Sequence, residues 1–268
     1  MSTVLVTGGT GHLGRCVVDL LVSGGHEVRL LARSPGTDPR VSWVRGDLAT
    51  GAGVAEAVAG VESVVHAATW SPAARRGYLL PVDLVRTPPD VDVEGTRRLL
   101  AEAERTGVGH FLHVSIVGLQ QVRLPYARIK LAAEGLVRSS PVPWSIVPAT
   151  GFHWLWHRML TKQLRLPVWT LPRLLVQPVD SDDFGEYVVE CLTEGAGGDR
   201  DDFAGPETLT LVDLGHQFLG ARGERRPLIP IPVPEKFAQV AGGLTGPDAR
   251  LGTTTWSEWL RRHPADER

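Results

Sequence analysis

The sequence predicts an α/β protein built on a doubly wound parallel sheet, followed by a small C-terminal region. Two observations carry this prediction. From residue 3 to residue 150, short apolar runs alternate with stretches of helical periodicity, which is typical of a parallel sheet covered by helices on both faces. A glycine-rich turn also stands at the first junction between a strand and a helix. Beyond residue 150 the alternation weakens, so we expect one wound domain at 1–150 and a substrate or lid region at 151–268, packed on the same unit and contributing late elements to it.

The N-terminal part of the chain supplies the first four expected strands. TVLVT at 3–7 is rich in β-branched residues and leads through the glycine turn into VVDLL, whose apolar residues suit a buried helix face. Two more apolar runs, at 27–33 and 41–47, predict the second and third strands. Small residues at 53–59 predict a short helix before the fourth strand at 62–69.

The alternation continues after a segment without a period. Residues 70–90 contain four prolines and are expected to form a long loop, of the kind that often carries function. A helix, a fifth strand, a second helix and a sixth strand are then expected at 91–107, 111–115, 125–140 and 144–150. Gly107 suits the end of the first helix, and Pro125 suits the first turn of the second, where a missing N–H costs nothing.

Composition excludes several classes of protein. The 28 basic and 30 acidic residues are spread along the chain, so no nucleic-acid-binding surface is expected. The two cysteines, Cys16 and Cys191, fit neither a metal site nor a disulfide framework, and the nine histidines form no metal-ligand pattern. The sequence has no signal-peptide pattern and no apolar run of about 18 residues. We therefore expect a soluble, cytoplasmic protein with no metal and no membrane partner, either a monomer or a homodimer.

The glycine turn is the main binding motif. In TGGTGHLG, Gly8, Gly11 and Gly14 are spaced G-x-x-G-x-x-G between the first strand and the first helix. Glycine permits a sharp turn and a close approach of backbone to a pyrophosphate, which then faces the positive end of the helix. An ordinary tight turn is the alternative, but its place at the first junction favours a dinucleotide site. The other expected contacts from this turn are Thr10, His12 and Leu13.

The end of the second strand bears on the choice of cofactor. A carboxylate there would accept a hydrogen bond from the ribose 2′-hydroxyl of NAD, whereas an arginine would pair with the 2′-phosphate of NADP. The strand ends in LLARSP, which offers Arg33 and Ser34 and no acid. NADP is therefore the expected cofactor, with NAD possible. The alternative for Arg33 is a solvated loop cation.

Taken together, the motifs resemble a known superfamily. The order TGGTGHLG, LLARSP, RGDL, VVHAAT, DVEGT, FLHVS, YARIK and SIVPAT is similar to that of the short-chain dehydrogenases/reductases. More narrowly, the chain resembles the extended and atypical branch that contains the NmrA-like NAD(P)-binding and isoflavone-reductase-like proteins. The resemblance is strong over 1–150 and weaker to about 215. It implies a Rossmann fold and a nicotinamide cofactor.

The resemblance also implies roles for single residues. Asp47 and Leu48 would lie at the adenine, and Ala67, Ala68 and Thr69 of the HAAT segment would pass beside the ribose and pyrophosphate. Pro148 follows the strand that abuts the nicotinamide. The resemblance assigns the catalytic set to Ser115, Tyr126 and Lys130, with Lys130 also contacting the ribose.

The spacing of Tyr126 and Lys130 gives this set a chemical meaning. Hydride transfer to a carbonyl develops negative charge on oxygen, so a proton donor is needed. Lys130 lies one helical turn after Tyr126 and is expected to lower its pKa, while Ser115 polarises the carbonyl. Three departures from the family pattern bear on this: Ser115 is the only hydroxyl in VSIVG, the interval to Tyr126 is short, and VPAT lacks an arginine before the proline.

The predicted function is NADP(H)-dependent reduction of a small apolar carbonyl, quinone or enone, with Tyr126 as proton donor. Two alternatives remain: a non-catalytic NAD(P)-binding regulator or redox sensor of NmrA type, and an epimerase or dehydratase acting on a nucleotide sugar. The aromatic residues Phe152, Trp154, Trp156 and Trp169 would stack on a flat substrate or else pack in the core or at a dimer contact. A membrane-surface helix at Arg158, Lys162 and Arg165 is the least favoured reading.

Overall fold

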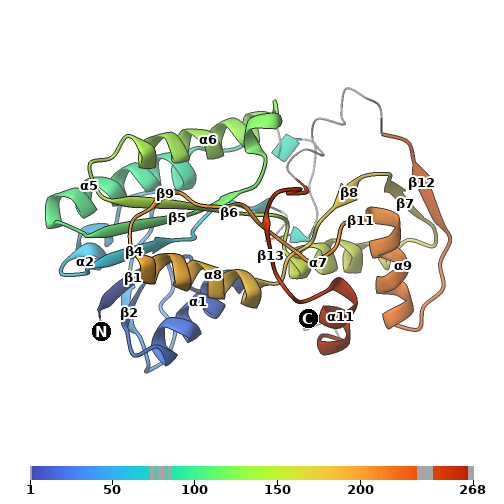
Figure 1. The fold of residues 1–268 in the computed structure, drawn as a ribbon, viewed down its shortest axis with the longest axis horizontal. Coiled ribbons are helices and arrows are strands. Elements are labelled where there is room, and N and C mark those ends of the chain that lie inside the picture. The colour runs from blue at the N-terminus through green and yellow to red at the C-terminus, as the bar shows by residue number, and fades with distance from the viewer. Residues whose placement is uncertain (1, 73–75, 78–81, 84–85, 234–243, 265–268) are drawn as a thin grey trace.

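A single parallel sheet organises the N-terminal part of the chain. The computed structural model describes residues 2–72, 76–77, 82–83, 86–233 and 244–264 (Figure 1). The central strands run in the order β3-β2-β1-β4-β5-β6, and every neighbouring pair is parallel. Their bounds are Thr3–Thr7 (β1), Glu27–Ala32 (β2), Ser42–Arg45 (β3), Ser63–His66 (β4), His110–Ile116 (β5) and Trp144–Ala149 (β6). The predicted doubly wound fold is confirmed.

Three short strands from beyond residue 150 extend this sheet. They are β9 (Gly198–Asp199), β10 (Phe203–Ala204) and β13 (Arg250–Leu251). β9 and β10 both pair in parallel with β6, and β13 pairs with β10. The C-terminal part of the chain therefore completes the sheet as well as covering one end of it.

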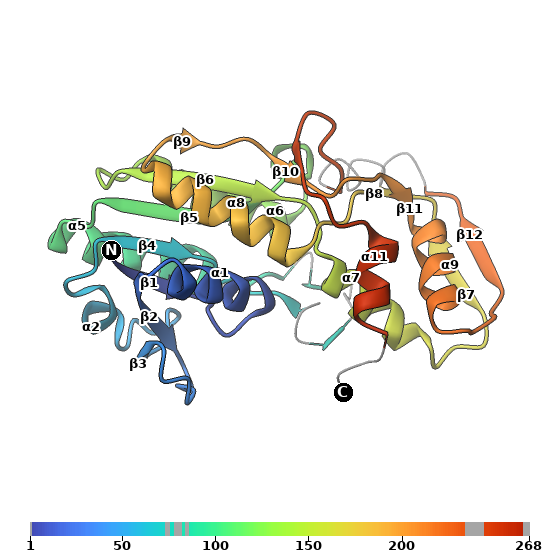
Figure 2. The same ribbon diagram turned by 60° about the horizontal axis from the view of Figure 1, so that its bottom comes forward.

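Helices cover both faces of the sheet (Figures 1 and 2). α1 (His12–Ser23) and α8 (Ser181–Glu194) lie against one face; α2 (Val54–Val58), α5 (Thr96–Thr106) and α6 (Pro125–Arg138) lie against the other. Each side has its own buried core, centred on Val17 and Phe184 on the first face and on Leu99 and Phe111 on the second. Two short irregular helices, η1 (Asp90–Gly95) and η2 (Leu119–Gln121), precede α5 and α6.

Local sequence signals determine several helix ends. Gly107 adopts φ 73° after α5, a left-handed conformation that glycine reaches without a Cβ clash. Pro125 occupies the first turn of α6, as predicted. The side chain of Asp180 accepts a hydrogen bond from the backbone N–H of Asp182 and caps α8. The loop expected at 70–90 lies partly outside the described residues.

The remaining elements form a lobe at one end of the molecule. It contains α7 (His153–Gln163), β7 (Trp169–Pro172), β8 (Leu175–Val176), β11 (Leu209–Thr210), α9 (Leu211–Ala221), β12 (Leu228–Ile231) and α11 (Trp256–Arg262). Its core holds Trp169, Phe218 and Trp256, all fully buried. Of the aromatic residues considered above, Trp169 therefore belongs to the core. None of the described helices is both long and apolar enough to cross a bilayer.

Candidate cofactor and active site

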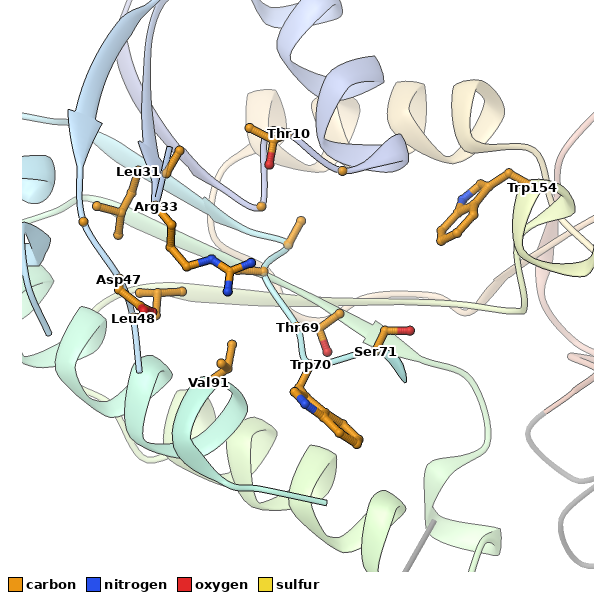
Figure 3. A pocket seen from close by; sticks show the side chains of 16 residues that line it. Thr10, Leu31, Arg33, Asp47, Leu48, Thr69, Trp70, Ser71, Val91 and Trp154 are labelled. Atoms are coloured by element: carbon orange, nitrogen blue, oxygen red, sulfur yellow. The ribbon is translucent and has the colours of Figure 1, made fainter. Parts of the chain in front are cut away.

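A cavity of about 340 Å³ opens at the carboxyl ends of β1, β2 and β4 (Figure 3). Open α/β sheets bind ligands at this edge, where the strand order reverses. Nine of the predicted cofactor residues line the cavity: Gly8, Thr10, Gly11, Arg33, Asp47, Leu48, Ala67, Ala68 and Thr69. Trp154, expected as a possible substrate contact, also lines the cavity. Six further lining residues were not predicted: Leu31, Ala32, Gly46, Trp70, Ser71 and Val91.

The glycine turn fits a pyrophosphate because it has no room for side chains. Gly8 has φ +76°, and a Cβ there would lie 2.7 Å from the carbonyl carbon of Ala67. A Cβ on Gly14 would lie only 2.1 Å from the carbonyl oxygen of Gly8. No side chain caps the N-terminus of α1 at Gly11, so the first N–H groups of the helix remain directed toward the turn. The arrangement suits an anion held by backbone.

Six predicted cofactor residues lie outside the cavity wall: His12, Leu13, Gly14, Ser34, Lys130 and Pro148. His12, Leu13 and Gly14 begin α1 behind the turn, and Ser34 is exposed beyond the end of β2. Pro148 lies in β6 and lines a separate polar cavity of about 320 Å³, together with Ile116 and Glu134. The cavity at the glycine turn therefore covers the part of the predicted site nearest β1 and β2.

Arg33 and Asp47 are the charged residues of the cavity wall. Figure 3 shows the Arg33 side chain reaching across the cavity from the end of β2. Its guanidinium is exposed and makes no hydrogen bond or ion pair with any described residue. The Asp47 carboxylate accepts a hydrogen bond from the N–H of Ala49 at 3.0 Å, which holds its own turn. Of the two charged residues of the cavity wall, Arg33 is thus the one whose side chain has no partner among the described residues.

Trp154 bounds the opposite end of the cavity (Figure 3). Its indole stacks on the imidazole of His12 with ring centroids 4.1 Å apart and an interplanar angle of 14°. Because Trp154 belongs to α7 and His12 to α1, the stack joins the C-terminal lobe to the phosphate turn. The buried indole Nε1 has no hydrogen-bond partner within the described part of the chain. Trp154 is therefore the aromatic residue placed to meet a ligand.

Lys130 is held by a buried ion pair that the sequence reading did not foresee. Its Nζ lies 2.6 Å from Oδ1 of Asp92, and the two side chains are 8% and 5% exposed. Lys130 also donates to Oγ1 of Thr69 and, at 3.4 Å, to the carbonyl oxygen of Trp70. Burial lowers the pKa of Lys130, and Asp92 opposes that shift. Lys130 thus reaches the cavity wall through Thr69 and Trp70.

Tyr126 lies beside this pair, but its acidity differs from the prediction. The Lys130 Nζ is 5.2 Å from the centroid of the half-buried Tyr126 ring. Burial, and then the negative charge of Asp92, raise the pKa of Tyr126 above its usual value. The expectation that Lys130 lowers this pKa does not hold in this structure, because burial and the charge of Asp92 together raise it. A raised pKa keeps the phenol protonated, as a proton donor requires.

Ser115 points to a different partner from the one predicted. Its hydroxyl donates to Oε1 of Glu134, a buried carboxylate on α6. Glu134 in turn pairs with Arg138 at 2.9 Å. Ser115 is itself buried and does not line the cavity at the glycine turn. The structure brings Tyr126 and Lys130 together and leaves Ser115 tied to the body of α6.

Removing Asp92 is expected to destabilise the protein strongly. Asp92→Ala leaves the Lys130 ammonium buried and unpaired, so the free energy of unfolding should fall by about 3–5 kcal/mol, as measured by urea unfolding. The double variant Asp92→Leu with Lys130→Met removes both charges and should recover most of that loss. Arg97→Ala, which breaks the exposed pair with Glu94, is the control and should cost at most about 1 kcal/mol. An equal loss in Asp92→Ala and Arg97→Ala would contradict the buried pairing.

A buried histidine, His66, lies at the end of β4 and is linked to Asp92 through hydrogen bonds. His66 Nδ1 lies 2.6 Å from the hydroxyl of Thr7, and its Nε2 lies 2.9 Å from the hydroxyl of Thr96. Thr96 donates to the backbone carbonyl of Asp92 at 2.6 Å. Burial lowers the pKa of His66 from its usual value of 6.5 to about 4. The imidazole is therefore neutral in the folded protein near pH 7.

This histidine predicts a loss of stability in acid. Below pH 6.5 the unfolded chain binds a proton at His66 that the folded protein does not bind until about pH 4. Stability should therefore fall as pH drops through that window, by about 3 kcal/mol from this residue alone. Urea unfolding at pH 7, 6 and 5 measures it. His66→Gln should make the dependence less steep by the share of His66, while His110, His113 and His153, whose pKa values burial also lowers, keep the rest. His216→Gln, at an exposed site, should leave the slope unchanged. An unchanged slope in His66→Gln would exclude His66 as a source.

Comparison with known sequences agrees with the site. Residues 8–154 match the model of a family described as NAD(P)H-binding. Divinyl chlorophyllide a 8-vinyl-reductase of Oryza sativa subsp. indica is 29% identical over 265 residues, covering 87% of this chain and 62% of the relative. The 3-beta-hydroxysteroid dehydrogenase of Mycolicibacterium neoaurum is 34% identical over 118 residues, covering 43% of this chain and 32% of the relative. The chain thus spans less than two thirds of either relative.

Solved structures share the fold. A short-chain dehydrogenase/reductase superfamily protein from Agrobacterium tumefaciens with bound NAD superposes with a TM-score of 0.73, at 21% identity, covering 98% of this chain and 96% of that one. MoeE5 in complex with UDP-glucuronic acid and NAD gives 0.74 at 18% identity, covering 97% and 99%. At these identities the likeness establishes the fold alone.

Proposed function

The chain belongs to the family described as NAD(P)H-binding. On this premise we propose that it is an NADP(H)-dependent reductase of the extended short-chain dehydrogenase/reductase type, acting on a small apolar carbonyl, quinone or enone. The observation that carries the proposal is the Tyr126–Lys130 pair, held by Asp92 and Thr69 against the cavity at the glycine turn. A protonated phenol near a nucleotide cavity is what reduction needs.

The residues of this cavity fit a nicotinamide dinucleotide. The backbone of Gly8, Gly11 and the start of α1 would hold its pyrophosphate, and the free guanidinium of Arg33 would pair with a 2′-phosphate. Lys130 would bind the ribose hydroxyls. When bound, the cofactor supplies a hydride to the substrate. Trp154 closes the far end of the cavity and limits the access of water.

The side chains of this chain then handle the proton. Tyr126 would donate its phenolic proton to the oxygen, or to the carbon of an enolate, on which negative charge develops. Lys130 would stabilise the resulting phenolate, which is otherwise disfavoured by burial and by Asp92. Because the pKa of Tyr126 is raised, the donor stays protonated across the neutral range, as reduction requires. Ser115 takes no part while its hydroxyl is bonded to Glu134.

An apolar substrate is favoured by the lining residues and by the relatives. Trp70 and Trp154 both contribute aromatic side chains to the lining of the cavity (Figure 3). The relatives from rice and Mycolicibacterium neoaurum are named for the reduction of a vinyl group on a chlorophyllide and for the oxidation of a hydroxysteroid. Both names describe largely apolar ring systems, and we extend their apolar character, though not their size, to the substrate of this chain.

A non-catalytic NAD(P)-binding sensor is the second candidate, and two contacts favour it. Ser115 is bonded to Glu134, and Asp92 compensates part of the charge of Lys130, which weakens the help that either residue can give to Tyr126. In a sensor, the same cavity would bind the dinucleotide without transferring hydride. The nucleotide-sugar alternative rests only on fold likeness at 18% identity and on no contact within this chain.

Turnover separates the two candidates. The purified protein is mixed with NADPH and a panel of quinones, enones and aromatic ketones, and NADPH oxidation is followed by its absorbance. A reductase oxidises NADPH with at least one member of the panel and in proportion to enzyme. If NADPH binds but is not oxidised with any member of the panel, the result supports the sensor and contradicts the reductase.

Arg33 is expected to select NADP over NAD. Arg33→Ala should weaken NADPH binding by about 10–100-fold, because a charged hydrogen bond contributes about 1.5–3 kcal/mol, and should leave NADH binding unchanged. Calorimetric titration with both nucleotides measures this. Arg45→Ala, at the exposed end of β3, is the matched control and should leave both affinities unchanged. Equal NADPH affinity of Arg33→Ala and the parent would show that another group binds the 2′-phosphate.

A further inference from the structure

An apolar ribbon lies at the end of the C-terminal lobe farthest from α5 (Figures 1 and 2). It consists of β7 and β12, which pair in parallel with Ile229 beside Thr170. Strand alternation turns Trp169 and Leu171 inward, where both are buried and lie close to Gly215 of α9. The side chains on the opposite face of the ribbon therefore point away from α9, so packing against that helix does not explain why they are apolar.

That opposite face carries exposed aliphatic side chains. Ile229 and Ile231 of β12 are 51% and 43% exposed, and Val168, just before β7, is 40% exposed. Leu166, in the preceding turn, is 50% exposed, and its carbonyl accepts a hydrogen bond from Arg226 that ties the turn to β12. We call Leu166, Val168, Thr170, Ile229 and Ile231 the ribbon face. Soluble proteins seldom gather exposed aliphatic residues in this way without a binding role.

Charge distinguishes the surroundings of the ribbon face from the rest of the chain. The segments 158–179 and 224–233 contain six basic residues and one acidic residue, Glu224, which pairs with Arg226, whereas the remainder contains 22 basic and 29 acidic residues. Arg165, Arg173 and Arg225 are exposed beside the ribbon and make no ion pair with any residue that the structure describes. An exposed aliphatic face with an unpaired cationic rim fits a surface that is both apolar and anionic.

We propose that the ribbon face docks on an anionic lipid surface. The aliphatic side chains would enter the boundary between headgroups and acyl chains, while the three guanidiniums bind lipid phosphates. A protein partner is less suited, because interface hot spots favour Trp, Tyr and Arg over Leu and Val. The net negative charge of the remaining chain would be repelled by the same surface, which leaves the ribbon as the docking side.

This inference goes beyond the proposed reductase activity and revises the expectation that the protein has no membrane partner. That expectation rested on the absence of a long apolar run and on a short basic helix pattern around Arg158, Lys162 and Arg165, and a two-stranded ribbon produces neither pattern. Docking requires neither cofactor nor turnover, so the two proposals can fail independently.

Vesicle co-sedimentation tests the docking directly. The full chain is mixed with vesicles of phosphatidylcholine alone, or of phosphatidylcholine with phosphatidylglycerol, at low and high salt. We expect roughly 100-fold tighter binding to the anionic vesicles, from three guanidiniums, and a loss of that preference at high salt. Ile229→Ser with Ile231→Ser, and separately Arg165→Gln with Arg173→Gln, should each weaken binding at least about tenfold.

A matched control keeps the test specific. Leu251→Ser removes an equally exposed leucine, at 53%, from β13 on the main sheet and should bind anionic vesicles like the parent. Circular dichroism melting checks that every variant is folded. Absence of binding to anionic vesicles, equal binding to neutral vesicles, or an equal loss in Leu251→Ser would each overturn the proposal. Self-association that the isoleucine variant abolishes, without vesicle binding, would assign the face to a second copy of the chain instead.

Discussion

Replacing Tyr126 with Phe is expected to lower the turnover of carbonyl or enone reduction by about 10²–10⁴-fold, the usual contribution of a positioned proton donor. NADPH affinity should not change, because Tyr126 does not line the cavity at the glycine turn. Steady-state NADPH oxidation and a separate binding titration measure the two effects. A fall in kcat with constant cofactor affinity identifies the phenol as the donor.

The pH dependence of turnover is a second test of the role of Tyr126. Since the pKa of Tyr126 is raised, reduction by the parent should show no loss of the protonated donor between pH 6 and pH 9. Tyr187→Phe is the matched control: it removes a phenol on α8 that donates to the carbonyl of Asp201, and turnover should be retained. Retained turnover in Tyr126→Phe would exclude the phenol as the donor, and equal losses in both variants would point to general damage.

Local signals made most of the wound domain predictable. A strand of five to seven residues is long enough for its apolar run to be recognised in the sequence. The turn at Gly8 requires glycine because a side chain there would clash with Ala67 and because Gly14 packs closely against it. The predicted helix end at Gly107 and helix start at Pro125 hold for the same reason, since each depends on neighbours within a few residues. By contrast, β9, β10 and β13 have two residues each, which is too short for any period to appear.

Contacts across long sequence distances explain what the sequence did not reveal at the site. Asp92 lies 38 residues before Lys130, and Ser115 lies 19 residues before Glu134, so neither pairing leaves a local pattern. The DVEGT segment did mark the position of Asp92, but it did not show that the carboxylate points at the lysine. Trp154 was recognised as an aromatic near the site, whereas its stacking on His12 depends on how α7 packs against α1.

Nucleotide binding by the glycine turn is the claim on which the other assignments depend. A calorimetric titration of the parent, Gly14→Ala and Gly135→Ala with NADPH tests it most directly. The new methyl group in Gly14→Ala would lie 2.1 Å from the carbonyl oxygen of Gly8, which forces the turn to move. In Gly135→Ala, on the exposed side of α6, the methyl group would meet no atom within 4 Å.

We predict one NADPH bound per chain in the parent and in Gly135→Ala, and no measurable binding in Gly14→Ala although the variant remains folded. Undiminished binding by Gly14→Ala, or no binding of either nucleotide by the parent, would contradict the assignment of this cavity to a dinucleotide.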